Sequence, residues 1–129
     1  MNPEIISIPK IKSPSGNYAI LEGNTLPFSI KRVYYLYDIP SGGARGGHSH
    51  INQQEFLVAV SGSFDVILKN RKEEVKITLN KPDKGLLIPK GIWRELNNFS
   101  SGAVCLVMAS DVFDESDYIR DFSDYLKSV

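Results

Sequence analysis

Short runs of β-branched and aromatic residues, separated by Gly, Pro, Asn and Asp, recur along most of this 129-residue chain. The runs are YAILEG, FSIKRVYYLYDI, EFLVAVSGSFDVILKN, EEVKITLN, GLLIPKG, WRELNNF and AVCLVMASDVF. Six or more strands at such spacing are typical of a β-sandwich or barrel. Between two of the apolar runs, Ser61, Gly62 and Ser63 predict a hairpin turn.

The tail DESDYIRDFSDYLKSV changes period, because its apolar residues recur at helical spacing. It predicts one C-terminal helix on the sheet, with Asp114 or Ser116 available as the N-cap. The apolar stripe comprises Tyr118, Ile119, Phe122, Tyr125 and Leu126. No repeat, linker or low-complexity segment is present, so residues 1–129 are expected to form one all-β domain with this single helix.

The charges balance, with 15 Lys and Arg against 15 Asp and Glu. No net field attracts the chain to nucleic acid or to an anionic membrane, so neither is expected as a partner. No signal peptide or membrane-length apolar run is visible, and the default expectation is a cytoplasmic protein. The single cysteine, Cys105, lies in an apolar run and is expected to be buried without a chemical role.

Both histidines of the chain lie in the stretch GGARGGHSH as a His-x-His pair, His48 and His50. Five residues separate Gly42 from His48, four separate His50 from Glu55, and six separate Glu55 from Gly62. This spacing matches the first sequence motif of the cupin family, whose fold is a small jelly-roll barrel. On a strand the two histidines point to the same side, and Glu55 from the next strand is expected to face them.

Two imidazoles and a carboxylate are a metal-ligand set that many cupins use. The second cupin motif adds a histidine two residues after the glycine of Pro-x-Gly, but in GLLIPKGIWRELNN the nearby position is occupied by Arg94. A guanidinium has no lone pair to donate, stays protonated and repels a metal ion. We therefore expect no metal and no other cofactor, although His48, His50 and Glu55 remain a possible three-ligand site.

Without a metal, the histidine pair is a pair of proton-transfer groups, because the imidazole pKa lies near neutral pH. Two such groups on one face suit an isomerase that moves protons between neighbouring atoms of one substrate.

Three phrases of the sequence resemble a particular cupin branch, the sugar 3,4-ketoisomerases, over nearly the whole chain. They are Lys31 to Tyr35 (KRVYY), Arg45 to His50 (RGGHSH) and Ser110 to Arg120 (SDVFDESDYIR). The resemblance implies a metal-free jelly-roll homodimer, often with strands exchanged between subunits. It implies that the substrate is dTDP-4-keto-6-deoxyglucose and that the carbonyl moves from C4 to C3 through an enediol. The product then passes to a pyridoxal-phosphate aminotransferase that makes a 3-amino-3,6-dideoxyhexose for a surface glycan.

The resemblance also assigns residues. The two catalytic histidines of the family fall on His48 and His50, with His50 interpreted as the base for the C3 proton and His48 as the group that moves the proton onward. The nucleotide-binding and active-site positions fall on Arg32, Tyr34, Tyr35, Tyr37 and Arg45. Tyr37, Arg45 or Arg94 is expected to donate to the enediolate oxygen. Arginines suit the pyrophosphate, and one of the strand tyrosines suits the thymine ring.

The chain departs from its relatives at a few positions near the expected sugar site. Glu55 follows Gln54, whereas relatives often have these residues in the reverse order, which leaves the role of Glu55 open. Many relatives have Trp-His where this chain has Trp93 and Arg94, and an arginine where it has Ser15. Because the histidine of the galacto-forming relatives is missing, we expect the gluco product.

Three other functions remain open. A 3,5-epimerase acting on the same nucleotide sugar is usually a longer chain. A metal-dependent oxygenase or isomerase would use His48, His50 and Glu55. A non-enzymatic sugar-binding module would need neither histidine for chemistry.

Overall fold

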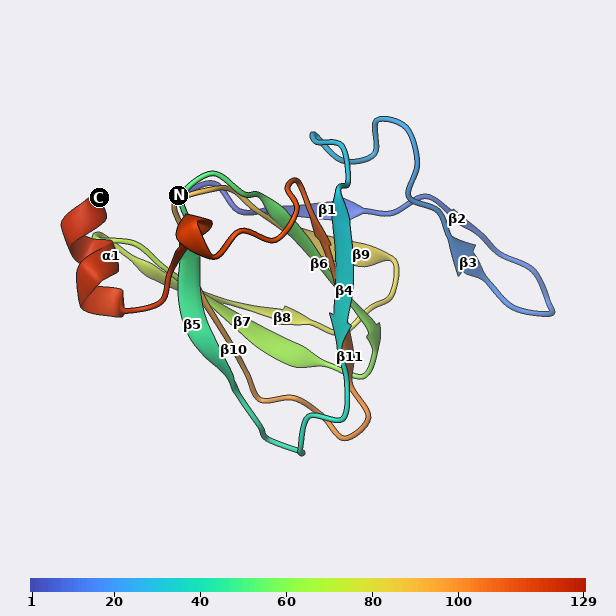
Figure 1. Ribbon diagram of the computed structural model, residues 1–129. Coiled ribbons are helices and arrows are strands. Elements are labelled where there is room, and N and C mark those ends of the chain that lie inside the picture. The colour runs from blue at the N-terminus through green and yellow to red at the C-terminus, as the bar shows by residue number, and fades with distance from the viewer.

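Two antiparallel sheets form the body of the molecule in the computed structural model, which describes residues 1–129 (Figure 1). The first sheet has the order β1 (Glu4–Ser7), β9 (Lys84–Ile88), β6 (Glu55–Ser61), β11 (Val104–Ala109) and β4 (Arg32–Leu36). The second has the order β12 (Tyr118–Ile119), β5 (Arg45–His50), β10 (Trp93–Asn97), β7 (Phe64–Lys69) and β8 (Glu74–Leu79). This confirms the predicted all-β cupin jelly roll with one C-terminal helix.

The main core lies between the two sheets. It is a cluster of 14 buried apolar residues, to which the first sheet contributes Leu57 and Val107 and the second contributes Val66, Leu68 and Leu96. A second cluster covers the outer face of the first sheet, where Ile8 and Leu26 pack with Phe56, Val58 and Met108. Strand β6 is buried on both faces by these clusters, which explains why the run EFLVAV is continuously apolar rather than alternating.

The prediction of a hairpin at residues 61–63 is wrong. Strands β6 and β7 are not paired with each other, since β6 pairs with β9 and β11 and β7 pairs with β8 and β10. The turn at Gly62 instead passes from one sheet to the other. Gly62 has a φ of 67°, and a β-carbon there would lie 2.5 Å from Ser100 Oγ, so both its conformation and its packing require glycine.

The C-terminal tail contains less helix than its periodicity predicted. Helix α1 spans Phe122–Ser128, and its N-cap is Asp121, whose side chain accepts from the Asp124 backbone N–H. The residues before it form a 3₁₀ turn, Glu115–Asp117, capped by Asp114, and the short strand β12. Strand β12 pairs with β5, which places Tyr118 opposite His50. The tail therefore adds a strand to the histidine-bearing edge before it becomes helical.

Helix α1 packs against strand β10 next to the histidine strand. The Tyr125 hydroxyl donates to the Gly91 carbonyl at 2.8 Å, and its ring lies beside Trp93. Trp93 in turn packs on Gly47 of β5, where a β-carbon would lie 2.5 Å from the indole. The helix thus supports the strand that carries both histidines.

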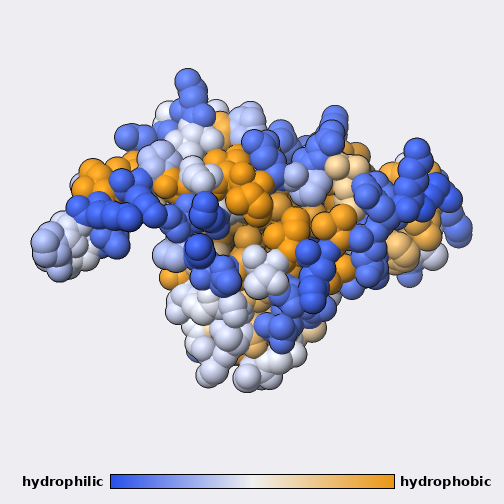
Figure 2. All heavy atoms as spheres, turned by 180° about the vertical axis from the view of Figure 1, so that it is seen from behind, coloured by the Kyte–Doolittle hydropathy of each residue, from blue (hydrophilic) through white to orange (hydrophobic).

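Part of the apolar surface is not covered by the chain itself. Strands β2 (Lys10–Ile11) and β3 (Tyr18–Ala19) form a hairpin that projects from the body (Figure 1). In the view from behind, apolar residues gather over the middle of the molecule and beside the base of this projection (Figure 2). The exposed large hydrophobic residues include Ile5, Ile11, Tyr18, Val33, Tyr35 and Tyr37.

None of the helices combines the length and the apolar character that crossing a membrane demands.

Candidate functional site

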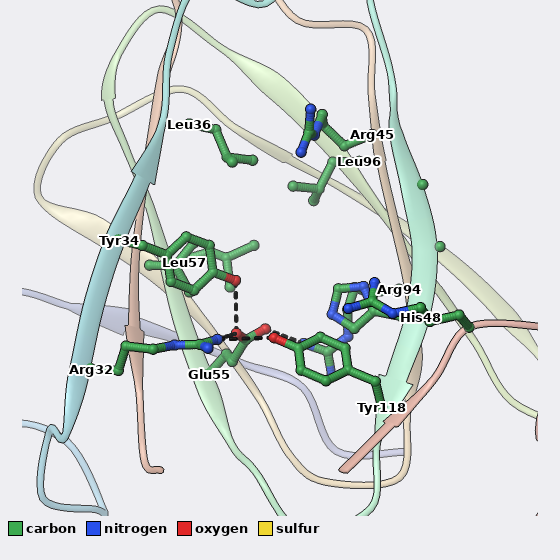
Figure 3. A pocket seen from close by; sticks show the side chains of 14 residues that line it. Arg32, Tyr34, Leu36, Arg45, His48, Glu55, Leu57, Arg94, Leu96 and Tyr118 are labelled. Carbon is green, nitrogen blue, oxygen red and sulfur yellow. Dashed lines mark hydrogen bonds and ion pairs between the residues drawn. The ribbon is translucent and has the colours of Figure 1, made fainter. Parts of the chain in front are cut away.

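A cavity of about 420 Å³ lies at one end of the main core, between the two sheets (Figure 3). Its wall comes from both sheets and from the segment that follows β11. The side chains around it are Arg32, Tyr34 and Leu36 of β4, Arg45 and His48 of β5, Glu55 and Leu57 of β6, Arg94 and Leu96 of β10, Val107 of β11, and Tyr118 and Arg120. Leucine and valine side chains from the core thus adjoin a concentrated group of charged ones.

Glu55 is the centre of this group, because three side chains donate to its carboxylate. Arg94 Nη1 donates to Oε1 at 2.7 Å, while the Tyr34 hydroxyl and Gln53 Nε2 donate to Oε2 at 2.9 and 3.0 Å. Glu55 and Arg94 are each 2 % exposed. Burial alone raises the pKa of Glu55, but the neighbouring His50, the charge of Arg94 and the hydrogen bond from Tyr34 outweigh it and lower the pKa to about 2. Glu55 is therefore ionised at neutral pH.

The two histidines contact each other directly. His48 Nε2 and His50 Nε2 are 3.1 Å apart, and the rings meet edge to face. His48 borders the cavity, whereas His50 lies behind it with 0 % exposure. A contact between two imidazole nitrogens is favourable only when one proton lies between them, so the pair forms a short path for a proton.

The surroundings of the two histidines differ in charge. Burial, the charge of Arg94 and the neighbouring His50 lower the pKa of His48 to about 3, so His48 is neutral at rest. His50 has a carboxylate on each side, since its Nδ1 is 3.1 Å from Asp117 Oδ2 and its Nε2 is 3.6 Å from Glu55 Oε1. Positive charge on the pair is thus better stabilised on His50 than on His48.

Cations and hydroxyl groups surround the rest of the cavity. Arg32 Nη2 donates to the Tyr118 hydroxyl at 3.0 Å, and its guanidinium lies over the Tyr34 ring. The Arg120 guanidinium lies 4.2 Å from the centre of the Tyr118 ring and is paired with Glu115. Together with Arg45, these arginines provide positive charge for an anionic ligand.

The residues do not fit a metal ion, although the ligand atoms of His48, His50 and Glu55 lie within 4.8 Å of one another. Arg94 already donates to Glu55 Oε1, and Tyr34 and Gln53 donate to Oε2. Arg94 therefore places a fixed positive charge against the carboxylate that a metal ion would need as a ligand.

The structure brings together most of the residues predicted from the sequence. Arg32, Tyr34, Arg45, His48, Glu55 and Arg94 line the same cavity, with His50 directly behind. The predicted contact between Glu55 and the histidine strand is present.

Four predicted residues lie elsewhere. Tyr35 and Tyr37 point to the opposite side of β4 from Tyr34 and are 60 % and 62 % exposed, because successive side chains of a strand alternate. Trp93 is buried beneath α1, where its indole N–H donates to Glu95. Ser15, also expected near the sugar, is exposed in the turn of the projecting hairpin and does not line the cavity.

Sequence reasoning missed four residues of the site. Gln53 donates to Glu55, Asp117 contacts His50, and Tyr118 and Arg120 line the cavity. The phrase DESDYIR was recognised as distinctive but interpreted as the start of a helix. The Tyr-x-Arg spacing within it could have indicated a strand that presents Tyr118 and Arg120 on one side, because alternate residues of a strand face the same side.

Comparisons with known proteins show which family the chain belongs to. The whole chain, residues 1–129, matches the family model described as FdtA: WxcM-like, C-terminal. It is 39 % identical to the TDP-4-oxo-6-deoxy-alpha-D-glucose-3,4-oxoisomerase of Aneurinibacillus thermoaerophilus, over 100 % of this chain and 94 % of that protein.

Two solved structures show the same fold at similar identity. The WlaRB TDP-quinovose 3,4-ketoisomerase of Campylobacter jejuni is 44 % identical, with a TM-score of 0.93 and 98 % of each chain covered. The QdtA 3,4-ketoisomerase of Thermoanaerobacterium thermosaccharolyticum, solved as a histidine-to-asparagine mutant in complex with TDP-4-keto-6-deoxyglucose, is 38 % identical. Its TM-score is 0.95, over 98 % of this chain and 93 % of that one. The chain therefore belongs to the FdtA family, the branch of the cupins formed by the TDP-sugar 3,4-ketoisomerases.

Proposed function

We propose that this protein converts dTDP-4-keto-6-deoxyglucose into the dTDP-3-keto-6-deoxyhexose by acid–base chemistry. The observation that carries this proposal is the pair of imidazoles in direct contact, one of which borders a cavity that also contains a carboxylate and several arginines. The names of the relatives support the same substrate and reaction.

The reaction moves two protons and one carbonyl. The C4 ketone acidifies the proton on C3, and a base removes it while the electron pair moves through the new C3–C4 double bond onto the C4 oxygen. Proton transfer from the C3 oxygen to the C4 oxygen, followed by protonation of C4, gives the C3 ketone. Groups that both accept and return protons are needed, and two neighbouring imidazoles meet this need.

The histidines act as one relay in this proposal. His48 is the member that contacts the sugar, because it forms the cavity wall, while His50 exchanges a proton with it across the 3.1 Å contact. This arrangement differs from the sequence interpretation, in which His50 alone takes the C3 proton. Deprotonation is favoured because His48 is neutral at rest and because the carboxylates beside His50 stabilise the acquired charge.

Donors around the cavity stabilise the enediolate and hold the nucleotide. The Tyr118 hydroxyl accepts from Arg32, which leaves its own proton free to donate into the cavity. Arg45 and Arg94 also line the wall and add positive charge where the oxyanion develops. Arg45 and Arg120 suit the pyrophosphate. Tyr37 is not part of this set within one chain.

We propose the gluco product over the galacto product. The relative at 44 % identity is named a TDP-quinovose 3,4-ketoisomerase, and quinovose is 6-deoxyglucose. Arg94 supports the same choice, because it lies on the cavity wall where many relatives have a histidine able to donate a proton. A 3-ketone is a substrate for transamination, so a pyridoxal-phosphate aminotransferase is the expected next enzyme.

We also propose that the protein is a homodimer. Strand β4 ends the first sheet, and Val33 and Tyr35 on its outer face, together with Tyr37 just after the strand, are all more than half exposed. An edge strand with unpaired backbone groups and apolar side chains is a favourable surface for a second copy. Light scattering during gel filtration should give twice the mass of one chain, and a monomeric mass would contradict this proposal.

Incubation of the chelator-treated protein with dTDP-4-keto-6-deoxyglucose in deuterated water tests the function. Proton NMR should show loss of the C3 proton signal and formation of a C3 ketone, and the C4 coupling after reduction distinguishes gluco from galacto. Inversion at C3 and C5 with the carbonyl still at C4 would indicate an epimerase. Activity only after metal addition would restore the metal-dependent alternative, and binding without any reaction would indicate a sugar-binding module.

A further inference from the structure

Asp117 occupies an unusual position for a residue just before a short strand. It lies 67 positions after His50 in the chain, yet its Oδ2 is 3.1 Å from His50 Nδ1. The same carboxylate accepts from the backbone N–H groups of Asn52 at 2.8 Å and Gln53 at 3.2 Å, and the Asp117 backbone carbonyl accepts from Ile51 N–H at 2.9 Å. Asp117 is thus held rigidly by the turn that follows the histidine strand.

This geometry determines which nitrogen of His50 carries its proton. An ionised carboxylate only accepts hydrogen bonds, so His50 Nδ1 must carry a hydrogen in order to bond with it. In neutral His50 the lone pair then lies on Nε2, the atom that faces His48 Nε2 at 3.1 Å. The hydrogen between the two histidines consequently belongs to His48 at rest.

We propose that Asp117 is a positioning residue for the histidine pair, which fixes His50 in the Nδ1–H form so that its Nε2 can accept the shared hydrogen when His48 takes a proton from the substrate. The inference rests on the proposed function for its catalytic part. When His48 takes a proton from the sugar, the hydrogen it shares with His50 shifts to His50 Nε2. His50 then carries two hydrogens and a positive charge between Asp117 and Glu55, and His48 is neutral again. The reverse shift returns the proton to C4.

The carboxylates contribute differently to this shift. The charge of Glu55 is neutralised by Arg94, and its oxygens also accept hydrogen bonds from Tyr34 and Gln53. Asp117, in contrast, accepts hydrogen bonds only from neutral backbone N–H groups and from His50. The negative charge of Asp117 is therefore the less compensated of the two, and it is the one in direct hydrogen-bonding contact with His50. Asp117 also ties the tail to the histidine strand, so its test must separate positioning from stability.

The chain offers a direct readout, because it contains only two histidines. Nitrogen-15 NMR of the imidazole rings distinguishes the Nδ1–H form from the Nε2–H form. In the unmodified protein one histidine should be fixed in the Nδ1–H form, and its signals should disappear in His50→Asn. In Asp117→Ala the remaining His50 signals should move toward an average of the two forms. Catalysis should fall at least about tenfold in kcat, with KM within about threefold.

The matched control is Asp114→Ala. Asp114 lies three residues earlier and caps the 3₁₀ turn through Ser116 N–H and the Ser116 hydroxyl, at an exposed position away from the histidines. The Asp114→Ala substitution should loosen the same segment without changing the ring-nitrogen signals or kcat.

An Nε2–H form for His50 in the unmodified protein overturns the inference without any variant. A loss of kcat in Asp117→Ala with unchanged ring signals also overturns it, because the effect is then structural. If the unmodified protein fails to isomerise the nucleotide sugar, the proposed function fails, while the ring signals still decide whether Asp117 fixes His50.

Discussion

Replacing either histidine with asparagine should lower kcat for the isomerisation by about 10²- to 10⁴-fold, the usual contribution of a positioned general acid or base. Asparagine has a similar reach but exchanges no proton at neutral pH. Both replacements should be severe because His48 and His50 share one hydrogen across a 3.1 Å contact, so that removing either residue interrupts the relay. Rapid-quench kinetics and C3 proton exchange in deuterated water measure the loss.

Binding of the nucleotide sugar should survive these substitutions within about threefold. The nucleotide contacts are assigned to arginines rather than to the histidines. The matched control is Ser49→Ala, because Ser49 lies between the two histidines on β5 and points to the other face of the strand. Full activity of His50→Asn alongside inactive His48→Asn would show that His48 acts alone and that the relay is wrong.

Truncating one partner of the buried pair between Glu55 and Arg94 should destabilise the fold by about 3–5 kcal/mol. In Glu55→Leu the Arg94 guanidinium remains buried without its acceptor, and in Arg94→Leu the Glu55 carboxylate loses its positive partner. The double variant should recover part of the loss, because two leucines leave no buried charge unpaired. Urea unfolding of the two single variants and the double variant measures the coupling between these residues.

The control for this pair is Glu115→Gln. Glu115 and Arg120 also form an ion pair, but both side chains are more than half exposed, and breaking it should cost less than about 1 kcal/mol. If the losses of stability in the Glu55 and Arg94 single variants simply add up in the double variant, the expected coupling is absent and the two charges are stabilised independently.

The order of strands along the chain was predictable, whereas their partners were not. Turn residues and β-branched runs located β6 to β11, because these signals are local. The passage at Gly62 from one sheet to the other depends on Ser100 and Ala103, which pack against it from about 40 residues away. A hairpin turn and a turn between sheets have the same local composition, so local sequence does not distinguish the two.

Residues of the site were predictable where a motif sets their spacing along the chain. They were not predictable where tertiary packing determines which side chains reach the cavity. His48, His50, Glu55 and Arg94 followed from two motifs and form the predicted cluster. Tyr34, Tyr35 and Tyr37 were assigned to the site together, but neighbouring side chains of a strand face opposite sides, and of the three only Tyr34 lines the cavity. Asp117 was missed because its contact with His50 depends on β12 joining the edge of β5, and the tail resembled a helix.

The guanidinium that occupies the cupin metal position has a consequence for the cell. Arg94 is covalently part of the chain, so its charge cannot dissociate on dilution, be removed by a competing chelator or change oxidation state. The positive charge at this position is present as soon as the chain is synthesised, and the cell does not have to take up or insert a metal ion. A sugar isomerase built in this way is expected to keep its activity when metal ions are scarce, a condition under which an enzyme that depends on a bound metal ion loses activity.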